Sequence, residues 1–177
     1  MPAPSPAPAP FQPPVTAQEL LERCAGRWLS LRTLVTVSRE EEGWDRSESA
    51  QLAFSWQPAE PGPELGVLRL HGPQQPDFQL HMVGAARDRE GDFAGSDGRR
   101  GRWRFDRDHV LQLTWCSGDQ QFEERIWFSK ANLRLRSRTV SCKNNPSAVQ
   151  ACAFYSEIRR LHAPPRRSRA PRRPSDP

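Results

Sequence analysis

The stretch that decides the fold is FEERIWFSKANLRLRSR, residues 122–138, in which two runs of alternating side chains follow each other. One side of the first run is mostly apolar and consists of Phe122, Glu124, Ile126 and Phe128. One side of the second run consists of Arg134, Arg136 and Arg138. A period of two is typical of β-strands, because successive side chains of a strand point to opposite faces. We therefore predict strands over 121–129 and 132–142.

The same period of two continues through most of the chain on either side of this stretch. Turn residues separate the alternating segments, as in Pro61–Gly62–Pro63 and Ser117–Gly118–Asp119. The further predicted strands are 27–38, 51–56, 65–71, 77–86, 90–95, 101–106, 109–116 and 148–160. Ten short strands joined by short loops favour an all-β antiparallel meander, either closed into a barrel or folded as a sandwich. A parallel βαβ arrangement is excluded, because no helical segment separates the strands.

A short helix is predicted before the first strand. Thr16 and Glu19 have the spacing of a capping box, in which a hydroxyl caps the helix start and a carboxylate follows three residues later. One apolar face is then formed by Leu20, Leu21 and Cys24. Gly26 can end the helix with a positive φ. We therefore predict a helix over 17–24.

The two ends of the chain differ in composition from its middle. Residues 1–14 contain seven of the 18 prolines and no charged side chain. Residues 163–177 contain five prolines and five arginines against one aspartate, and so four of the five net positive charges. A basic tail is compatible with an acidic partner, but Pro and Arg without apolar residues favour a disordered extension. We expect disordered tails at 1–14 and 163–177, one folded domain at 15–162, and no nucleic-acid partner.

Several classes of protein are excluded by what the sequence lacks. No apolar run approaches the 18 residues of a membrane span, and the start of the chain does not resemble a signal peptide. The four cysteines show no CxxC pair and no histidine at zinc-ligand spacing. We therefore expect a cytoplasmic protein with reduced thiols, no membrane span and no metal site.

The arginine row of residues 134–138 has two interpretations. The arginines can face water while Leu133 and Leu135 pack in the core. They can instead face the inside of a barrel, which leaves room for one small ligand, and bind an anionic group there. Glu124 has the same ambiguity, because a buried carboxylate needs either an arginine of the next strand or a ligand N–H as its partner. Periodicity alone leaves both interpretations open.

Three motifs resemble one family, the S/U-type phycobiliprotein lyases. GRWLSLRT at 26–33 is similar to the family's entry motif GxWxSQRT, which follows a short helix. FEERIWFSKANLRLRS at 122–137 is similar to its ERIWF and NLRLR signature, the most specific of the three matches. FYSEIR at 154–159 resembles its closing strand. The matches occur in the family's order and extend from about residue 19 to residue 160.

This resemblance implies both a fold and a function. The fold is a ten-stranded antiparallel calycin barrel, similar to lipocalins or fatty-acid-binding proteins, with a short N-terminal helix. The activity is that of an enzyme which binds an open-chain tetrapyrrole, phycocyanobilin or phycoerythrobilin, and attaches it by a thioether to a cysteine of a phycobiliprotein α or β subunit. By position in the motifs, Arg134 and Arg136 would hold the bilin propionates, with Arg32 as a further contact. Glu124 would face the pyrrole nitrogens as the catalytic residue.

The resemblance leaves the partners and the exact role open. The bilin is expected as the substrate, and no cofactor is expected. A non-catalytic bilin carrier or chaperone, or a partner subunit of a heteromeric lyase, would use the same barrel. Assembly as a homodimer, or as a heterodimer with a related lyase, is compatible with any of these roles.

Several positions depart from the family pattern, among them Leu34 and Val35, which replace a more polar pair after Thr33. Leu31 stands where the family has Gln, and Arg138 stands where small hydroxyl residues are usual. An inward Arg138 would narrow the cavity or add a partner for a carboxylate.

Trp28 follows the helix directly, and we expect it to pack across one end of the barrel against Arg159.

Overall fold

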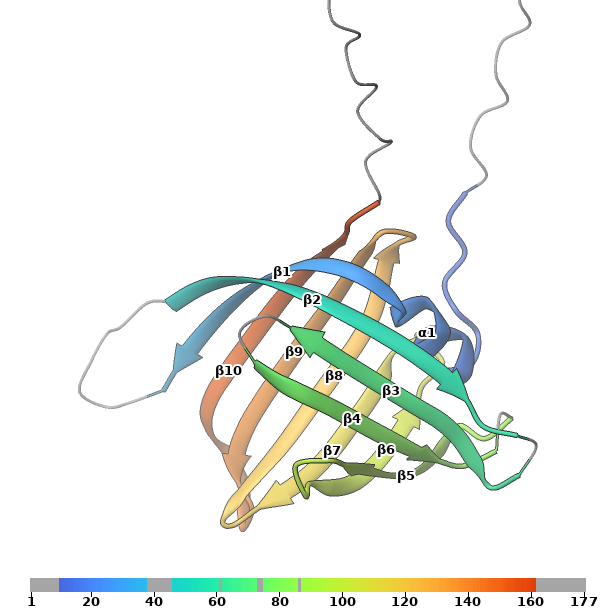
Figure 1. Cartoon of the computed structure of the whole chain (residues 1–177). Coiled ribbons are helices and arrows are strands. Elements are labelled where there is room, and N and C mark those ends of the chain that lie inside the picture. The colour runs from blue at the N-terminus through green and yellow to red at the C-terminus, as the bar shows by residue number, and fades with distance from the viewer. Residues whose placement is uncertain (1–9, 38–45, 61, 73–74, 86, 162–177) are drawn as a thin grey trace, which may run out of the picture.

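The computed structural model describes residues 10–37, 46–60, 62–72, 75–85 and 87–161 as one helix and ten strands. The elements, in chain order, are α1 (Ala17–Cys24), β1 (Gly26–Thr36), β2 (Arg46–Pro58), β3 (Glu64–Gly72), β4 (Gln75–Val83), β5 (Glu90–Gly95), β6 (Arg100–Phe105), β7 (Leu111–Ser117), β8 (Gln120–Lys130), β9 (Leu133–Cys142) and β10 (Asn145–Arg159). Each strand pairs with its neighbours in sequence, and β1 pairs antiparallel with β10 (Figure 1). The sheet is therefore a closed barrel, which confirms the predicted ten-stranded fold and excludes the sandwich.

The alternation in the sequence sets which side chains point into the barrel. In β1, Trp28 and Ser30 are buried, whereas Leu29 and Leu31 are exposed. The register carries this pattern to the neighbouring strand, because Trp28 lies opposite Arg159 and Ser30 lies opposite Glu157. Side chains directly opposite each other in a sheet lie on the same face. The inner surface of β1, β9 and β10 is therefore a continuous wall that includes polar and charged groups.

Helix α1 closes one end of the barrel (Figure 1). Its start is capped as predicted, with the Glu19 backbone N–H donating to the Thr16 hydroxyl at 3.1 Å. Its inner face is fully buried and consists of Ala17, Leu20, Leu21 and Cys24. The helix ends at Cys24, and Gly26 then turns the chain into β1 with a φ of 128°. A Cβ at Gly26 would lie 2.5 Å from Nη1 of Arg159, so both φ and space favour glycine here.

Trp28 anchors the apolar core beneath this helix. It is completely buried, and its indole N–H donates to the Cys24 carbonyl at 2.8 Å. The Phe128 ring packs edge-on against it at 6.0 Å, and the Arg159 guanidinium lies 4.4 Å from its ring centre. The expected packing of Trp28 against Arg159 is therefore confirmed.

Residues before 15, the predicted start of the folded domain, pack against the barrel. Phe11 packs partly buried against the core, and Pro14 is fully buried. Two hydrogen bonds hold this segment, one from Arg23 to the Gln12 carbonyl at 2.7 Å and one between His109 Nδ1 and the Pro14 carbonyl at 2.9 Å. Residues 10–14 carry no charge, so their apolar side chains can be buried at little cost. The rest of the predicted tails, 1–9 and 163–177, lies outside the described residues.

Several strand boundaries also differ from the prediction, most of all in β2, which begins at Arg46 and not at residue 51. The strand predicted at 109–116 begins at Leu111, because a turn precedes it in which His109 has a φ of 63°. The Asp106 carboxylate stabilises this turn by accepting hydrogen bonds from the backbone N–H groups of Asp108 and Val110. The last strand begins at Asn145, three residues before its predicted start.

Candidate functional site

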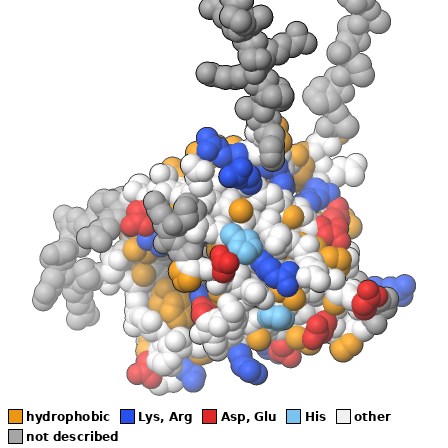
Figure 2. Space-filling model, viewed as in Figure 1, with side chains coloured by type: hydrophobic (Ala, Val, Ile, Leu, Met, Phe, Trp, Pro, Cys, Tyr) orange, Lys and Arg blue, Asp and Glu red, His pale blue; other side chains and the backbone are white. Residues whose placement is uncertain are grey.

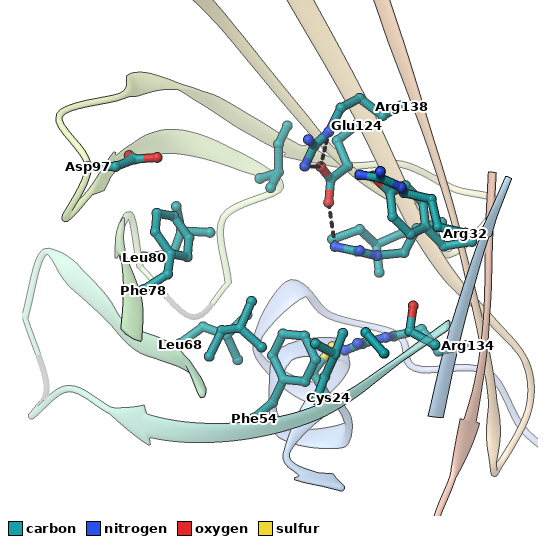
Figure 3. Close-up of a pocket in the computed structure, with 18 of the residues that line it drawn as sticks. Cys24, Arg32, Phe54, Leu68, Phe78, Leu80, Asp97, Glu124, Arg134 and Arg138 are labelled. Atoms are coloured by element: carbon teal, nitrogen blue, oxygen red, sulfur yellow. Dashed lines mark hydrogen bonds and ion pairs between the residues drawn. The ribbon is translucent and has the colours of Figure 1, made fainter. Parts of the chain in front are cut away.

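The interior of the barrel contains a cavity of about 840 Å³. It extends from Cys24, beside α1, to the turn residues Asp97 and Arg99 at the other end, which we call the mouth. One wall, on β2, β3 and β4, is apolar and includes Leu52, Phe54, Leu68, Phe78 and Leu80. The other wall, on β8 and β9, is charged and includes Glu124, Arg134, Arg136 and Arg138. Figure 3 shows the two walls facing each other across the cavity.

All three arginines of β9 point into the barrel, so their outward orientation is excluded. Arg134 lies opposite Glu157 of β10, and Arg138 lies opposite Glu124 of β8. Carboxylates on the same face of the two neighbouring strands offset the cost of removing the guanidinium groups from water. The outward positions of β9 are taken by side chains such as Leu133 and Leu135, which are half-buried.

Arg134 lies deepest, and its side chain is only 1% exposed. Its Nε donates to Oε2 of Glu157 at 2.6 Å, and its guanidinium lies between the rings of Trp28 and Phe54. Glu157 is fully buried and also accepts a hydrogen bond from the Ser30 hydroxyl at 3.2 Å. This ion pair forms the floor of the cavity.

Arg136 connects the two buried carboxylates. Its Nη1 donates to Oε1 of Glu124 at 3.0 Å, and its Nε lies 3.3 Å from Oε1 of Glu157. The guanidinium also lies 4.2 Å from the centre of the Tyr155 ring. Burial alone lowers the pKa of Arg136, but the two carboxylates outweigh it and raise that pKa. Arg136 therefore remains a cation inside the barrel.

Glu124 is held by two arginines and is ionised. Besides Arg136, it accepts two hydrogen bonds from Arg138, at 2.8 and 2.5 Å (Figure 3). Burial raises the pKa of Glu124, whereas the adjacent Arg136 and Arg138 lower it, and the net shift is downward. The ion pair predicted for this carboxylate, with arginines of the next strand, is therefore present. Glu124 can act as a fixed negative charge at neutral pH, but it holds no proton to donate.

Two further arginines lie toward the mouth of the cavity. Arg32 of β1 donates to Glu48 of β2 at 2.8 Å and is partly exposed. Arg99 is paired with Asp97, and its guanidinium lies 4.7 Å from the centre of the Phe78 ring. Cations thus line the cavity from its floor to its mouth.

Three of these arginines have a buried nitrogen that makes no hydrogen bond within the described residues. These nitrogens are Arg32 Nε, Arg134 Nη2 and Arg136 Nε. Arg136 Nε nevertheless lies 3.3 Å from Oε1 of Glu157, so it is ion-paired without the geometry of a hydrogen bond. These are the three arginines for which the sequence resemblance implied ligand contacts. Buried donors are nearly always paired, so these nitrogens mark places where the side chains of the barrel do not fully satisfy the guanidinium groups. Moreover, the floor and wall contain three guanidinium groups against two carboxylates, which leaves one positive charge unbalanced.

No metal centre and no membrane helix are found in the described residues. No group of three or more histidine, cysteine or acidic side chains gathers there, and no helix combines the length and apolarity that crossing a membrane requires. The four cysteines are free thiols. Burial raises the pKa of Cys24, so this thiol at the cavity floor is a poor nucleophile.

Known proteins with similar sequences share one description. A family model for CpeS-like proteins matches residues 81–160. A protein of Paulinella chromatophora named chromophore lyase CpcS/CpeS 1 is 30% identical over 154 residues, which cover 84% of this chain and 90% of that protein. This chain belongs to the CpcS/CpeS chromophore lyase family. The protein of the same name in Trichodesmium erythraeum is 43% identical over 61 residues, or 34% of this chain and 33% of that protein.

The fold of this chromophore lyase matches that of a solved relative. The S-type phycobiliprotein lyase CPES of Guillardia theta superposes with a TM-score of 0.64, covering 84% of this chain and 95% of that chain at 18% identity. The resemblance stated from three short motifs is thereby confirmed for the family and for the barrel.

Several residues of the lyase cavity were not singled out from the sequence. Ser30 lines the floor, Glu157 pairs there with Arg134 and Ser30, and Arg99 lies at the mouth. The sequence does indicate the side on which Glu157 lies, because Glu157 shares one face of the predicted last strand with Tyr155 and Arg159. Arg99 lies between the strands predicted at 90–95 and 101–106, where no periodicity indicates which way a side chain points.

Proposed function

We propose that this lyase binds an open-chain tetrapyrrole, phycocyanobilin or phycoerythrobilin, in the barrel cavity and attaches it by a thioether to a cysteine of a phycobiliprotein subunit. The observation that carries the proposal is the arginine wall of the cavity, in which Arg134, Arg136 and Arg138 face only two buried carboxylates and Arg32 adds a further cation nearer the mouth. Across the cavity from this wall lies an apolar one. A bilin combines the matching features, since it has flat apolar rings and two propionate carboxylates. The cavity volume also lies in the range of sites that enclose ligands of drug size.

The charged wall would orient the pigment. Arg134 and Arg136 would donate to the propionates, and Arg32 would add a contact nearer the mouth. Guanidinium groups suit this role because they bind carboxylates through two parallel hydrogen bonds and remain charged at all working pH values. The excess positive charge of the wall favours an anionic ligand over a neutral one.

Glu124 would act on the conjugated system of the pigment. Its carboxylate is ionised, so placed near the pyrrole N–H groups it would favour the protonated bilin, which is the better electrophile. The thiolate of the client protein attacks the ethylidene carbon, the double-bond electrons move into the ring system, and a proton is taken up there. An S–H group thus adds across a double bond without a leaving group. The lyase contributes orientation and the exclusion of wrong adducts.

Co-production of the lyase with a bilin and an apo-phycobiliprotein subunit tests this function. We expect the client band to keep its pigment in a denaturing gel, where zinc fluorescence shows a covalent bilin. A client whose acceptor cysteine is replaced by serine is the matched control and should stay unlabelled. If the lyase binds pigment but every α and β client remains unlabelled, the protein is a carrier or needs a partner subunit, and the proposed activity is wrong.

A further inference from the structure

The exposed apolar side chains of the described residues are concentrated on two neighbouring strands. Ten large apolar residues are exposed, and eight of them lie on β1, on β10 or directly beyond the end of one of these strands. These eight are Leu29, Leu31, Val35, Val37, Val149, Phe154, Ile158 and Leu161. Scattered apolar residues are normal on a protein surface, but a contiguous group of them marks an interaction site.

The register places these side chains side by side on the outside of the barrel. Leu29 lies opposite Ile158, and Ile158 lies opposite Leu133 of β9. Trp127 of β8 extends the group, because its ring packs against that of Phe154 at 6.1 Å. We call this surface the outer β1–β10 face and define it by Leu29, Leu31, Trp127, Leu133, Phe154 and Ile158.

The rest of the outer surface is different in character. The outward positions of β6 are taken by Arg100, Arg102 and Arg104, all of them charged and exposed. Charged and histidine side chains are spread over the face seen in Figure 2. The apolar character of the outer β1–β10 face is therefore a local feature and not a general property of this barrel.

The charges around this face favour a partner of opposite sign. The exposed cations beside it are Arg27, Lys130 and Arg160, and Arg125 is also exposed but is ion-paired with Asp106 at 3.9 Å. Among the described parts of β1, β8, β9 and β10, Glu123 is the one acidic side chain directed outward near this face. In a symmetric pair of two copies, this basic rim would meet itself across the interface. Like charges brought together at an interface disfavour that pairing. A second copy is therefore a poor occupant of this face.

The apolar track also extends to the mouth of the cavity. Val35 and Val37 continue it along β1, and Val149 continues it along β10, at the end of the barrel away from α1. The Val37 backbone N–H donates to the Gln150 carbonyl at 2.8 Å, so the two ends of the track lie together. A protein bound along this track would have part of its surface beside the opening from which a ligand is delivered.

We propose that the outer β1–β10 face is the docking surface for the client subunit, and that the client presents an apolar surface edged by carboxylates. This inference rests on the proposed lyase function, since it names the partner of that reaction. The apolar centre would supply contact area, and the basic rim would orient the client and speed its association.

Binding of apo-phycobiliprotein α and β subunits to the lyase provides the test. We expect the double variant Leu31→Ser/Phe154→Ser to bind its client about tenfold more weakly than the wild type, because exposed apolar contacts are lost while the cavity is untouched. Its bilin affinity and melting temperature should equal those of the wild type. Val83→Ser is the matched control, because Val83 is as exposed as Leu29 but lies on β4. It should bind the client normally.

The rim is tested separately by charge reversal. The variant Arg27→Glu/Lys130→Glu should lose affinity for the client at low salt, and its binding should depend less on salt than that of the wild type. We expect light scattering to give the mass of one chain for the wild type at the concentrations used.

Three results would overturn this docking surface. The first is that the Leu31→Ser/Phe154→Ser variant binds the client as tightly as the wild type does. The second is that no subunit binds the wild type. The third is that the wild type is a dimer in solution whereas this variant is a monomer. The proposed lyase function fails in a different way, through client binding without covalent transfer of pigment. The two failures are therefore distinguishable.

Discussion

Glu124 illustrates how a charge is kept inside this barrel. Two arginines on one neighbouring strand hold it, and together they lower the pKa of its carboxyl against the effect of burial. A folded-state pKa below the usual 4.5 means that the unfolded chain binds the proton more tightly. The ion pairs of Glu124 thus stabilise the fold above about pH 4.5, and this stabilisation is lost as the pH falls through the lowered pKa.

We therefore predict that Glu124→Gln lowers the free energy of unfolding at pH 7 by about 3 kcal/mol, because two arginines lose their carboxylate in a buried site. The deficit should narrow as the pH falls below about 4.5, where the wild type loses the same interaction. Denaturant unfolding of both proteins at pH 7 and at about pH 3.5 measures this. A deficit that is equal at both pH values would show that the carboxylate charge contributes nothing.

At the scale of elements, the segment before α1 acts as part of the closed end of the barrel. Phe11 and Pro14 pack beside the helix, and the Arg23 guanidinium lies 6.0 Å from the centre of the Phe11 ring. The sequence indicated a disordered stretch because proline is frequent there and no charge is present. The same lack of charge allows the last residues of the stretch to be buried.

Truncation separates the two parts of this N-terminal segment. Removal of residues 1–9 should leave the melting temperature unchanged, because their composition offers little to bury. Removal of residues 1–14 should lower it by roughly 4–8 °C, which corresponds to about 2 kcal/mol of lost packing in a domain of this size. Thermal unfolding of both variants against the full chain is the measurement. Equal melting temperatures for all three would mean that residues 10–14 add no stability.

For the whole molecule, the strands could be predicted from the sequence more fully than the cavity. The period of two in residues 122–138 identifies β8 and β9, and the same pattern identifies the other strands. Closure into a barrel depends on pairs such as Trp28 and Arg159, which are far apart in sequence. The orientation of Arg134 depends on Glu157, 23 residues away on another strand. Periodicity fixes faces within a strand but not the register between strands, so these pairings needed the family resemblance or the structure.

The central claim is that the arginine wall recognises the carboxylates of a bilin. It is tested most directly by the affinity of the wild-type protein for a bilin and for its propionate dimethyl ester, measured by absorption titration. Each lost charge-assisted pair should cost about 1.5–3 kcal/mol, so we predict that the ester binds roughly ten- to a hundred-fold more weakly. In the Arg136→Gln variant, the difference in affinity between the free acid and the ester should shrink, because one partner of the propionates is missing. The Arg138→Gln variant should keep most of this difference. Equal affinity of the wild type for the free acid and the ester would contradict the claim and leave the barrel without its assigned ligand contacts.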